Sequence, residues 1–256
     1  MSLERQINIK TPAQIKIMRE AGHINATVLA KVKEHLQPGV TTADLNAAAE
    51  EVLTSFGCVS PFKGYGRPPY PSSITVCIND EMVHGIPHPK RKLKEGDIVS
   101  IDCGTILDGF VADSAFTAGV GEISPEATKL LEVTEGALHA GIEKMRRGNR
   151  TGDVSAAIQN YVESRGFHVT REYTGHGVGR KMHEGPQVPN CGNAGSGLLL
   201  RPGLTIALEP MVLVGTHETR VLPDKWTVVS ADGSLTAHFE HTIAVTEGSP
   251  LILTVL

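Results

Sequence analysis

Apolar residues recur at helical spacing in two pairs of segments along the chain. The first pair is predicted over residues 12–37 and 41–56, and the second over residues 125–145 and 153–166. Each segment carries an apolar stripe, and proline, glycine or a capping side chain marks its ends, as in amphipathic helices. Short runs rich in Ile, Val, Phe and Thr follow each pair and are typical of strands. The pattern predicts a helix–helix–strand order that occurs twice.

The two helix pairs share landmarks at a constant spacing. The landmarks of the first pair return 109 positions later in the second: Gly39 and Gly148, Asp44 and Asp153, Gly57 and Gly166. A chance match of element order is the alternative to this interpretation. We expect one domain over residues 1–256 with an internal duplication, its halves lying at about 12–120 and 125–246.

The run from Ile98 to Phe116 predicts a β-hairpin around Asp108-Gly109, a dipeptide that suits a two-residue type I′ turn. If residues 107 and 110 are partners, residue 104 faces 113 and residue 102 faces 115. Asp102 and Asp113 then lie diagonally on one face, with Cβ atoms roughly 7 Å apart. Two carboxylates on an apolar hairpin are costly unless paired, so a metal site is the alternative to a solvated face.

Further polar residues extend this set. Residues 94–102 resemble residues 201–209, which makes Glu209 the counterpart of Asp102, and the predicted strand over residues 237–245 makes Glu240 the counterpart of Asp113. His176 stands between glycines, which allow close approach of the backbone. Four carboxylates and one imidazole suit two divalent cations better than a tetrahedral structural zinc, and such a pair of cations serves hydrolysis.

Composition limits the other functions. With 40% apolar residues, 20% charged residues and a net charge of −4, the chain gives no general argument for DNA or membrane binding. The basic run Lys90-Arg91-Lys92, with Lys94, is either a solvated loop or a contact for RNA or an acidic partner. No apolar signal segment begins the sequence and its four cysteines form no Cys-x-x-Cys pair, so a cytoplasmic protein with free thiols is expected.

From Pro12 to Val245 the chain resembles the type I methionine aminopeptidases. The resemblance rests on the spacing of the five residues above and on the motif Tyr173-x-Gly175-His176-Gly177-Val178-Gly179-x-x-x-His183. It implies an α+β, pita-bread (creatinase/aminopeptidase) fold, with two pseudo-twofold-related α/β halves around an antiparallel β-sheet. It also implies one catalytic domain, expected as a monomer, that removes the initiator methionine from nascent chains with a small second residue. Contact with the ribosome through the basic run is left open.

The resemblance further implies the role of each site residue. The metal ligands would be Asp102, Asp113, His176, Glu209 and Glu240, holding two divalent cations of Co, Mn, Fe, Ni or Zn, with Asp113 and Glu240 bridging them. Catalysis would use His84 and His183 beside the scissile amide and Glu209 as proton shuttle. The methionine pocket would be formed by Phe62, Tyr65, Tyr70, Thr75, Met182 and Trp226.

The sequence departs from the type I pattern in the pocket. Arg67-Pro68-Pro69 resembles a short insertion between the two pocket tyrosines, and Met182 stands where an aromatic residue is common. Two other interpretations stay open: an Xaa-Pro peptidase of the same fold, which usually carries an additional N-terminal domain, and a metal-free pita-bread binding module, which has usually lost ligands.

Overall fold

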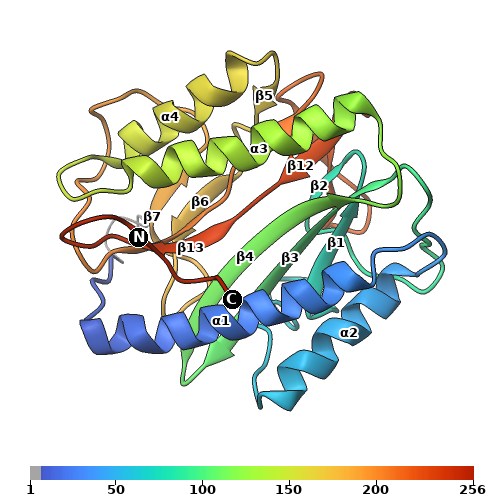
Figure 1. Ribbon diagram of the computed structural model, residues 1–256, viewed down its shortest axis with the longest axis horizontal. Helices are drawn as coiled ribbons and strands as arrows, with labels where there is room; N and C mark the ends of the chain where they lie inside the picture. The colour runs from blue at the N-terminus through green and yellow to red at the C-terminus, as the bar shows by residue number, and fades with distance from the viewer. Residues whose placement is uncertain (1–6) are drawn as a thin grey trace.

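The computed structural model describes residues 7–256, in which two helix pairs pack against a set of mainly antiparallel strands (Figure 1). The helices are α1 (Pro12–Glu34), α2 (Thr42–Ser55), α3 (Pro125–Lys144) and α4 (Thr151–Glu163). The strands of the first half are β1 (Ile74–Ile78), β2 (Glu81–Val83), β3 (Ile98–Leu107) and β4 (Phe110–Gly119). Those of the second are β5 (His168–Val169), β6 (Thr174–Gly177), β7 (Glu184–Pro189), β8 (Thr205–Leu208), β9 (Met211–Leu213), β10 (Thr219–Val221), β11 (Val228–Ser230), β12 (Thr236–His238), β13 (His241–Ala244) and β14 (Leu251–Ile252). The described residues form no helix with the length and apolar character needed to cross a membrane.

Local side-chain hydrogen bonds fix where the helices begin. Thr11 and Thr41 are the N-caps of α1 and α2, each with a reciprocal capping box that satisfies two free backbone amides. The helix α4 differs from the expectation, because Asp153 is its third residue and not its cap. The Asp153 carboxylate accepts the backbone N–H of Arg150, the N-cap residue, at 2.7 Å.

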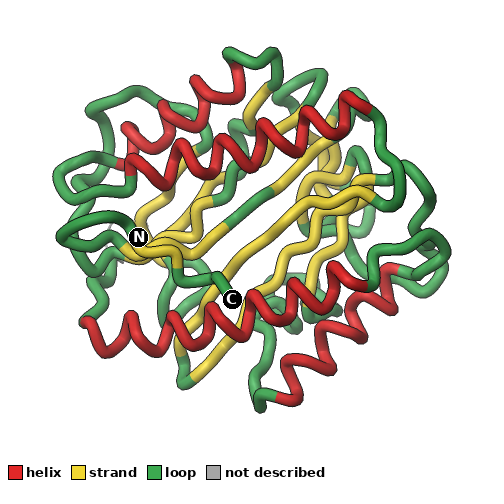
Figure 2. The backbone as a smooth tube through the Cα atoms, in the orientation of Figure 1, coloured by secondary structure: helices red, strands yellow, loops and turns green. Residues whose placement is uncertain are grey.

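Each helix pair covers its own apolar core. The first core joins α1 and α2 to β1 and β3 through residues such as Leu45 and Ile101, which are fully buried. The second joins α3 and α4 to β8 and β13 through residues such as Leu130 and Ile158. Burying each such side chain contributes roughly 1.5–3 kcal/mol. The two helix pairs lie on opposite sides of the strands that run between them in the view of Figure 2.

The strands form four small sheets in the described part of the chain. Their orders are β1-β3-β4, β14-β13-β8-β6-β7, β12-β9-β5 and β10-β11-β2. The predicted hairpin is confirmed as β3 and β4, with Leu107 opposite Phe110 at the turn, Gly104 opposite Asp113 and Asp102 opposite Ala115. Its turn residues Asp108 and Gly109 both have positive φ, at 48° and 74°.

A seam between β4 and β13 joins the two halves at the middle of the molecule. The backbones of Ala115 and Glu240 exchange both N–H···O bonds, at 2.9 and 3.3 Å. Two residues further along each strand, the Thr242 hydroxyl accepts the Asp113 N–H at 2.9 Å and donates to the Asp113 carbonyl at 2.8 Å. Asp113 and Glu240 are therefore held at diagonal positions across the seam, in segments from different halves.

The last strand is interrupted where a continuous one was expected. β12 ends at His238 and β13 begins at His241, because β12 pairs with β9 whereas β13 pairs with β8. The partner strand is interrupted at Glu209-Pro210, where proline has no N–H to donate to the ladder. Both glutamates thus lie at breaks between strands.

Candidate active site

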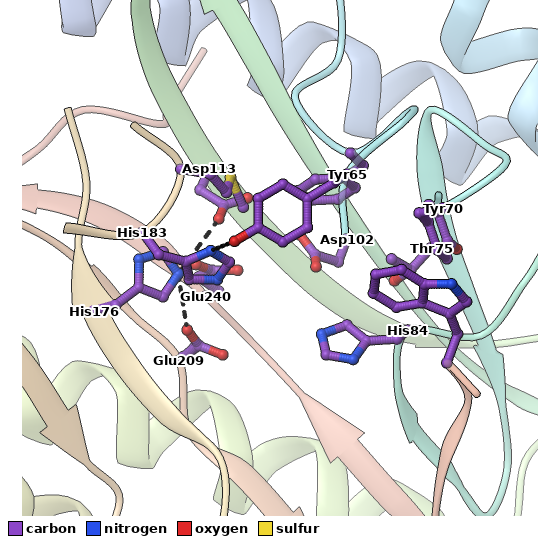
Figure 3. Close-up of a pocket in the computed structure, with 13 residues that line it drawn as sticks. Tyr65, Tyr70, Thr75, His84, Asp102, Asp113, His176, His183, Glu209 and Glu240 are labelled. Atoms are coloured by element: carbon purple, nitrogen blue, oxygen red, sulfur yellow. Dashed lines mark hydrogen bonds and ion pairs between the residues drawn. The ribbon is translucent and has the colours of Figure 1, made fainter. Parts of the chain in front are cut away.

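A single cavity of about 130 Å³ opens beside the seam, and every site residue named from the sequence lines it. Its lining consists of Phe62, Tyr65, Tyr70, Thr75, His84, Asp102, Asp113, His176, Met182, His183, Glu209, Trp226 and Glu240. Figure 3 shows Asp113, Glu209, Glu240 and His176 gathered at one side, Tyr70 and Thr75 at the other, and Asp102 between the two groups. The cavity therefore has an acidic end and an aromatic end.

The acidic end combines side chains from both halves. Asp102 and Asp113 come from β3 and β4, whereas Glu209 follows β8 and Glu240 precedes β13. One donor atom each of Asp113, His176 and Glu240 lies within 4.8 Å of the other two. Sheet register and strand breaks thus bring together side chains that are far apart in the sequence.

His176 is held between strands that approach it closely. A Cβ at Gly177 would lie 2.1 Å from the Gly185 carbonyl oxygen, so only glycine fits beside the histidine. The Nδ1 of His176 lies 2.9 Å from the Gly177 carbonyl oxygen, to which it donates. Its Nε2 consequently presents a lone pair to the acidic end, 3.4 Å from Glu209 Oε1 and 3.9 Å from Asp113 Oδ2.

Burial shifts the protonation of this cluster. Desolvation raises the pKa of Asp102 to about 7, and it raises the pKa of Asp113, Glu209 and Glu240 well above the usual range, helped by the neighbouring carboxylates. Desolvation likewise lowers the pKa of His176 to about 3.

The cluster has the donor chemistry of a cation site. Asp102 Oδ1, Asp113 Oδ1 and Glu240 Oε1 are buried without a hydrogen-bond partner, and in the described residues no Lys or Arg forms an ion pair with these carboxylates. Buried carboxylates without donors need either protons or cations. The residues present therefore fit divalent metal ions.

Two further histidines border the cluster. His183 lies with its ring centroid 4.3 Å from that of His176, and its Nδ1 is 2.7 Å from the Tyr65 hydroxyl. His84 follows β2 with a φ of 61°, a left-handed conformation that costs a non-glycine residue roughly 1–3 kcal/mol. Desolvation lowers the pKa of both histidines, that of His84 to about 4. Both imidazoles are therefore neutral hydrogen-bonding groups near pH 7.

The aromatic end is a closed apolar wall. Tyr70 packs edge-on against Trp226 with ring centroids 5.2 Å apart, and its hydroxyl donates to the Gly85 carbonyl at 2.8 Å. The Tyr70 ring, and not its hydroxyl, is therefore what this wall offers to the cavity. Thr75 lies on β1 directly opposite Asp102, which links the aromatic end to the acidic end.

The loop that contains Arg67-Pro68-Pro69 keeps both pocket tyrosines at the cavity. The backbone N–H of Tyr70 donates to the Tyr65 carbonyl at 2.8 Å, which closes the loop around the insertion. Tyr65 lies at the rim and is 44% exposed, whereas Tyr70 is buried. Residues 67–69 therefore lie in a loop that starts and ends at the two pocket tyrosines, and both tyrosines line the cavity.

Sequence reasoning missed one residue beside the cluster. His238 is buried, and its Nε2 lies 3.9 Å from Glu209 Oε2 and 3.8 Å from Glu240 Oε2. A signal was present, because residues 238 and 240 stand two positions apart in a strand-type segment and so tend to share a face.

Comparison with known proteins identifies relatives of the whole chain. Residues 16–247 match the model of Metallopeptidase family M24. A methionine aminopeptidase of Clostridium acetobutylicum is 48% identical over 248 residues, which cover 97% of this chain and 98% of the relative.

Solved structures give a matching result. The methionine aminopeptidase of Thermotoga maritima superposes with a TM-score of 0.95 at 44% identity, covering 98% of this chain and all of that one. The Xaa-Pro dipeptidase of Bacillus anthracis superposes with a TM-score of 0.78 at 22% identity, and the match covers 98% of this chain but 62% of the dipeptidase. The second likeness shows a shared fold alone.

Proposed function

The chain belongs to metallopeptidase family M24, and from this premise we propose how its cavity removes an N-terminal methionine. It is a methionine aminopeptidase with the pita-bread fold that methionine aminopeptidases share with Xaa-Pro peptidases. The prediction of fold, family and activity from the sequence is thereby confirmed. The roles of individual residues, the metal count and the substrate preference are proposed below.

Two divalent cations are proposed at the acidic end. Their ligands would be Asp102, Asp113, His176, Glu209 and Glu240, supported by the buried carboxylate oxygens that have no other partner. Co, Mn, Fe, Ni and Zn all accept such a donor set. The chemistry supplied by bound cations is polarisation of the scissile carbonyl and a lowered pKa of water.

The remaining polar groups bind the substrate amide and transfer protons during its cleavage. His183, oriented by Tyr65, donates a hydrogen bond to the carbonyl oxygen of the scissile amide. His84 accepts a hydrogen bond from the N–H of the same amide. Glu209 takes a proton from the attacking water and returns it to the leaving amine, so that the carbon–nitrogen bond breaks as a neutral amine departs. The position of Glu209 supports this role, because it lines the cavity beside the proposed metal ligands and the two histidines.

The aromatic end receives the methionine side chain. Phe62, Tyr70 and Trp226 offer ring surface, with Tyr65, Thr75 and Met182 completing the wall. A flexible thioether packs well against aromatic rings. The observation that carries the proposal is that this apolar wall and the carboxylate cluster border one cavity, so a bound methionine places its amide beside the cluster.

The substrates are proposed to be the N-termini of nascent proteins whose second residue is small. Lys90, Lys92 and Lys94 are exposed and Arg91 pairs with Glu81, so three lysines of the basic run are available for contact with the ribosome. A monomer in the cytoplasm is the corresponding expectation for the whole molecule.

Peptide cleavage tests the proposal. The metal-free protein should not release methionine from Met-Ala-Ser, and Mn²⁺ or Co²⁺ should restore release. Met-Lys-Ser should stay intact, because the proposed site accepts only a small second residue. His176→Ala removes one ligand and should abolish restoration, with release of free methionine as the measurement.

Absence of cleavage with every metal would overturn the proposed roles. Cleavage of Xaa-Pro peptides in its place would favour the alternative peptidase of the same fold. A protein that binds neither metal nor peptide would favour the binding module, although five usable donor residues at the acidic end argue against it.

A further inference from the structure

His238 lies beside the acidic end without lining the cavity. It ends β12, is 2% exposed, and reaches Glu209 and Glu240 from the protein interior. Its Nε2 is buried and has no hydrogen-bond partner. A buried polar atom in this state calls for an explanation, because leaving it unpaired costs free energy.

The backbone of His238 is fixed to the seam. Its N–H donates to the Thr117 hydroxyl at 2.9 Å, and that hydroxyl donates to the His238 carbonyl at 2.8 Å. The same hydroxyl lies 2.8 Å from that of Ser100 on β3. The backbone of His238 is therefore hydrogen-bonded to β4 and, through the Thr117 hydroxyl, linked to β3. The imidazole consequently projects from a fixed backbone position.

Glu209 directs one carboxylate oxygen at His176 and the other at His238, whereas Glu240 directs one oxygen at His238. Glu209 presents Oε1 to His176 Nε2 at 3.4 Å and Oε2 to His238 Nε2 at 3.9 Å. Glu240 presents Oε2 to His238 Nε2 at 3.8 Å, while its Oε1 has no hydrogen-bond partner. His238 thus faces one oxygen of each glutamate and leaves the other oxygen free.

We propose that His238 is a positioning residue of the metal centre, whose Nε2–H is shared between Glu209 Oε2 and Glu240 Oε2. The inference rests on the proposed function, since it assigns the Oε1 atoms to the metals. Both distances, 3.9 and 3.8 Å, exceed the upper limit of an N–H···O hydrogen bond by about 0.6–0.7 Å, a gap that rotation of the ionised carboxylates would have to close. Donors of this kind orient ligating carboxylates, and their loss typically costs 10- to 100-fold in metal affinity.

Mn²⁺ binding to the metal-free protein tests the assignment. His238→Leu should bind Mn²⁺ about 10- to 100-fold more weakly than the wild type. His238→Gln keeps an N–H donor and should stay within about threefold. His139→Gln, the same change at an exposed position of α3, is the matched control. Calorimetric titration gives the affinities, and the thermal midpoint of each metal-free variant shows whether it folds.

The tautomer of His238 provides a second readout that needs no destabilising variant. In the Zn²⁺-loaded protein, imidazole ¹⁵N spectra assigned with His238→Gln should show a proton on Nε2. An unprotonated Nε2 would overturn the proposal, because the imidazole would then have no Nε2–H to donate to the glutamates. Equal losses in the Gln and Leu variants would also overturn it, because a retained N–H donor would then make no difference.

The outcomes separate this inference from the function on which it rests. A wild-type protein that binds no Mn²⁺ would overturn both. A wild type that binds Mn²⁺, together with a folded His238→Leu that binds it equally well, would overturn the positioning role alone.

Discussion

Two histidines of the cavity each have Nδ1 in one hydrogen bond. His176 donates from Nδ1 to the Gly177 carbonyl, so its Nε2 is an acceptor directed at the carboxylates. His183 Nδ1 lies 2.7 Å from the Tyr65 hydroxyl, and its proposed role requires that this hydroxyl donates, which leaves a proton on Nε2 for the substrate. The proposed roles of the two side chains are thus opposite, one as ligand and one as donor, because their neighbours differ.

Removal of the Tyr65 hydroxyl tests the assignment of His183. Tyr65→Phe should lower kcat/KM by about 3- to 10-fold, equivalent to roughly 0.5–1.5 kcal/mol for one hydrogen bond. The thermal midpoint should not change, because Tyr65 is 44% exposed at the rim. Steady-state cleavage of Met-Ala-Ser is the measurement. Tyr161→Phe, which removes a hydroxyl far from the cavity, should leave the rate unchanged, and an equal effect of both variants would contradict the assignment.

At the scale of single elements, the hairpin was predictable and the loops around it were not. Asp108-Gly109 sets the turn, and the turn sets the facing of Asp102 and Asp113. Local chemistry of this kind is visible in the sequence. The break at Glu209-Pro210 depends on which strands pair, and the bond from Tyr65 to His183 depends on a loop, so both required the tertiary structure.

A buried ion pair holds the segment that carries His183. Lys10 Nζ lies 2.6 Å from Glu184 Oε2, with side chains 3% and 2% exposed. The other oxygen of Glu184 accepts the backbone N–H groups of Arg180 and Lys181, at 2.8 and 3.2 Å. A residue before α1 therefore anchors the start of β7, one position after His183.

Breaking that pair should destabilise the protein. Lys10→Met leaves the Glu184 charge buried and should lower the free energy of unfolding by about 3–5 kcal/mol, measured by urea denaturation. Adding Glu184→Gln should recover part of the loss. Lys63→Met, at the exposed pair with Glu50, is the control and should cost less than about 1 kcal/mol. Equal losses at the two pairs would contradict the anchoring role.

For the whole molecule, the buried carboxyl groups of the acidic end make the stability of the metal-free protein depend on pH. Burial raises the pKa of four carboxyl groups in the metal-free protein, that of Asp102 to about 7 and the others well above their usual range. The native state then binds more protons than the unfolded chain, so stability falls as pH rises through the native pKa values. The buried histidines oppose this slope only below about pH 6.5, their unfolded value.

The metal-free protein should therefore lose stability between pH 6.5 and 8. Each buried carboxyl that is protonated in the native state and ionised in the unfolded chain should lower the thermal midpoint by roughly 3–6 °C per pH unit. Saturating Mn²⁺ should remove the decline, because metal-bound carboxylates are already ionised. Thermal unfolding with and without Mn²⁺ measures both. Glu240→Gln deletes one titrating group and should flatten the metal-free slope, whereas a midpoint that rises with pH would contradict the account.

The residues that line the candidate site were predictable, but the contacts among them were not. Thirteen residues named from the sequence line one cavity. Strand facing, the internal repeat and the flanking glycines marked the four carboxylates and His176, and the resemblance to type I methionine aminopeptidases supplied the other eight. His238 escaped notice although its spacing from Glu240 was a signal, because the strand break between residues 238 and 241 and the approach to Glu209 are visible only in the tertiary structure. The internal duplication stays a prediction, although each helix pair has a separate core.

The seam between β4 and β13 sets an order of events during translation. Asp102 and Asp113 leave the ribosome long before Glu209 and Glu240 are made, so the emerging hairpin carries two carboxylates and no partners. The proposed metal site is therefore complete only after the last strands have been made. A copy still under synthesis consequently lacks the full cavity, and removal of an N-terminal methionine falls to finished copies of the enzyme.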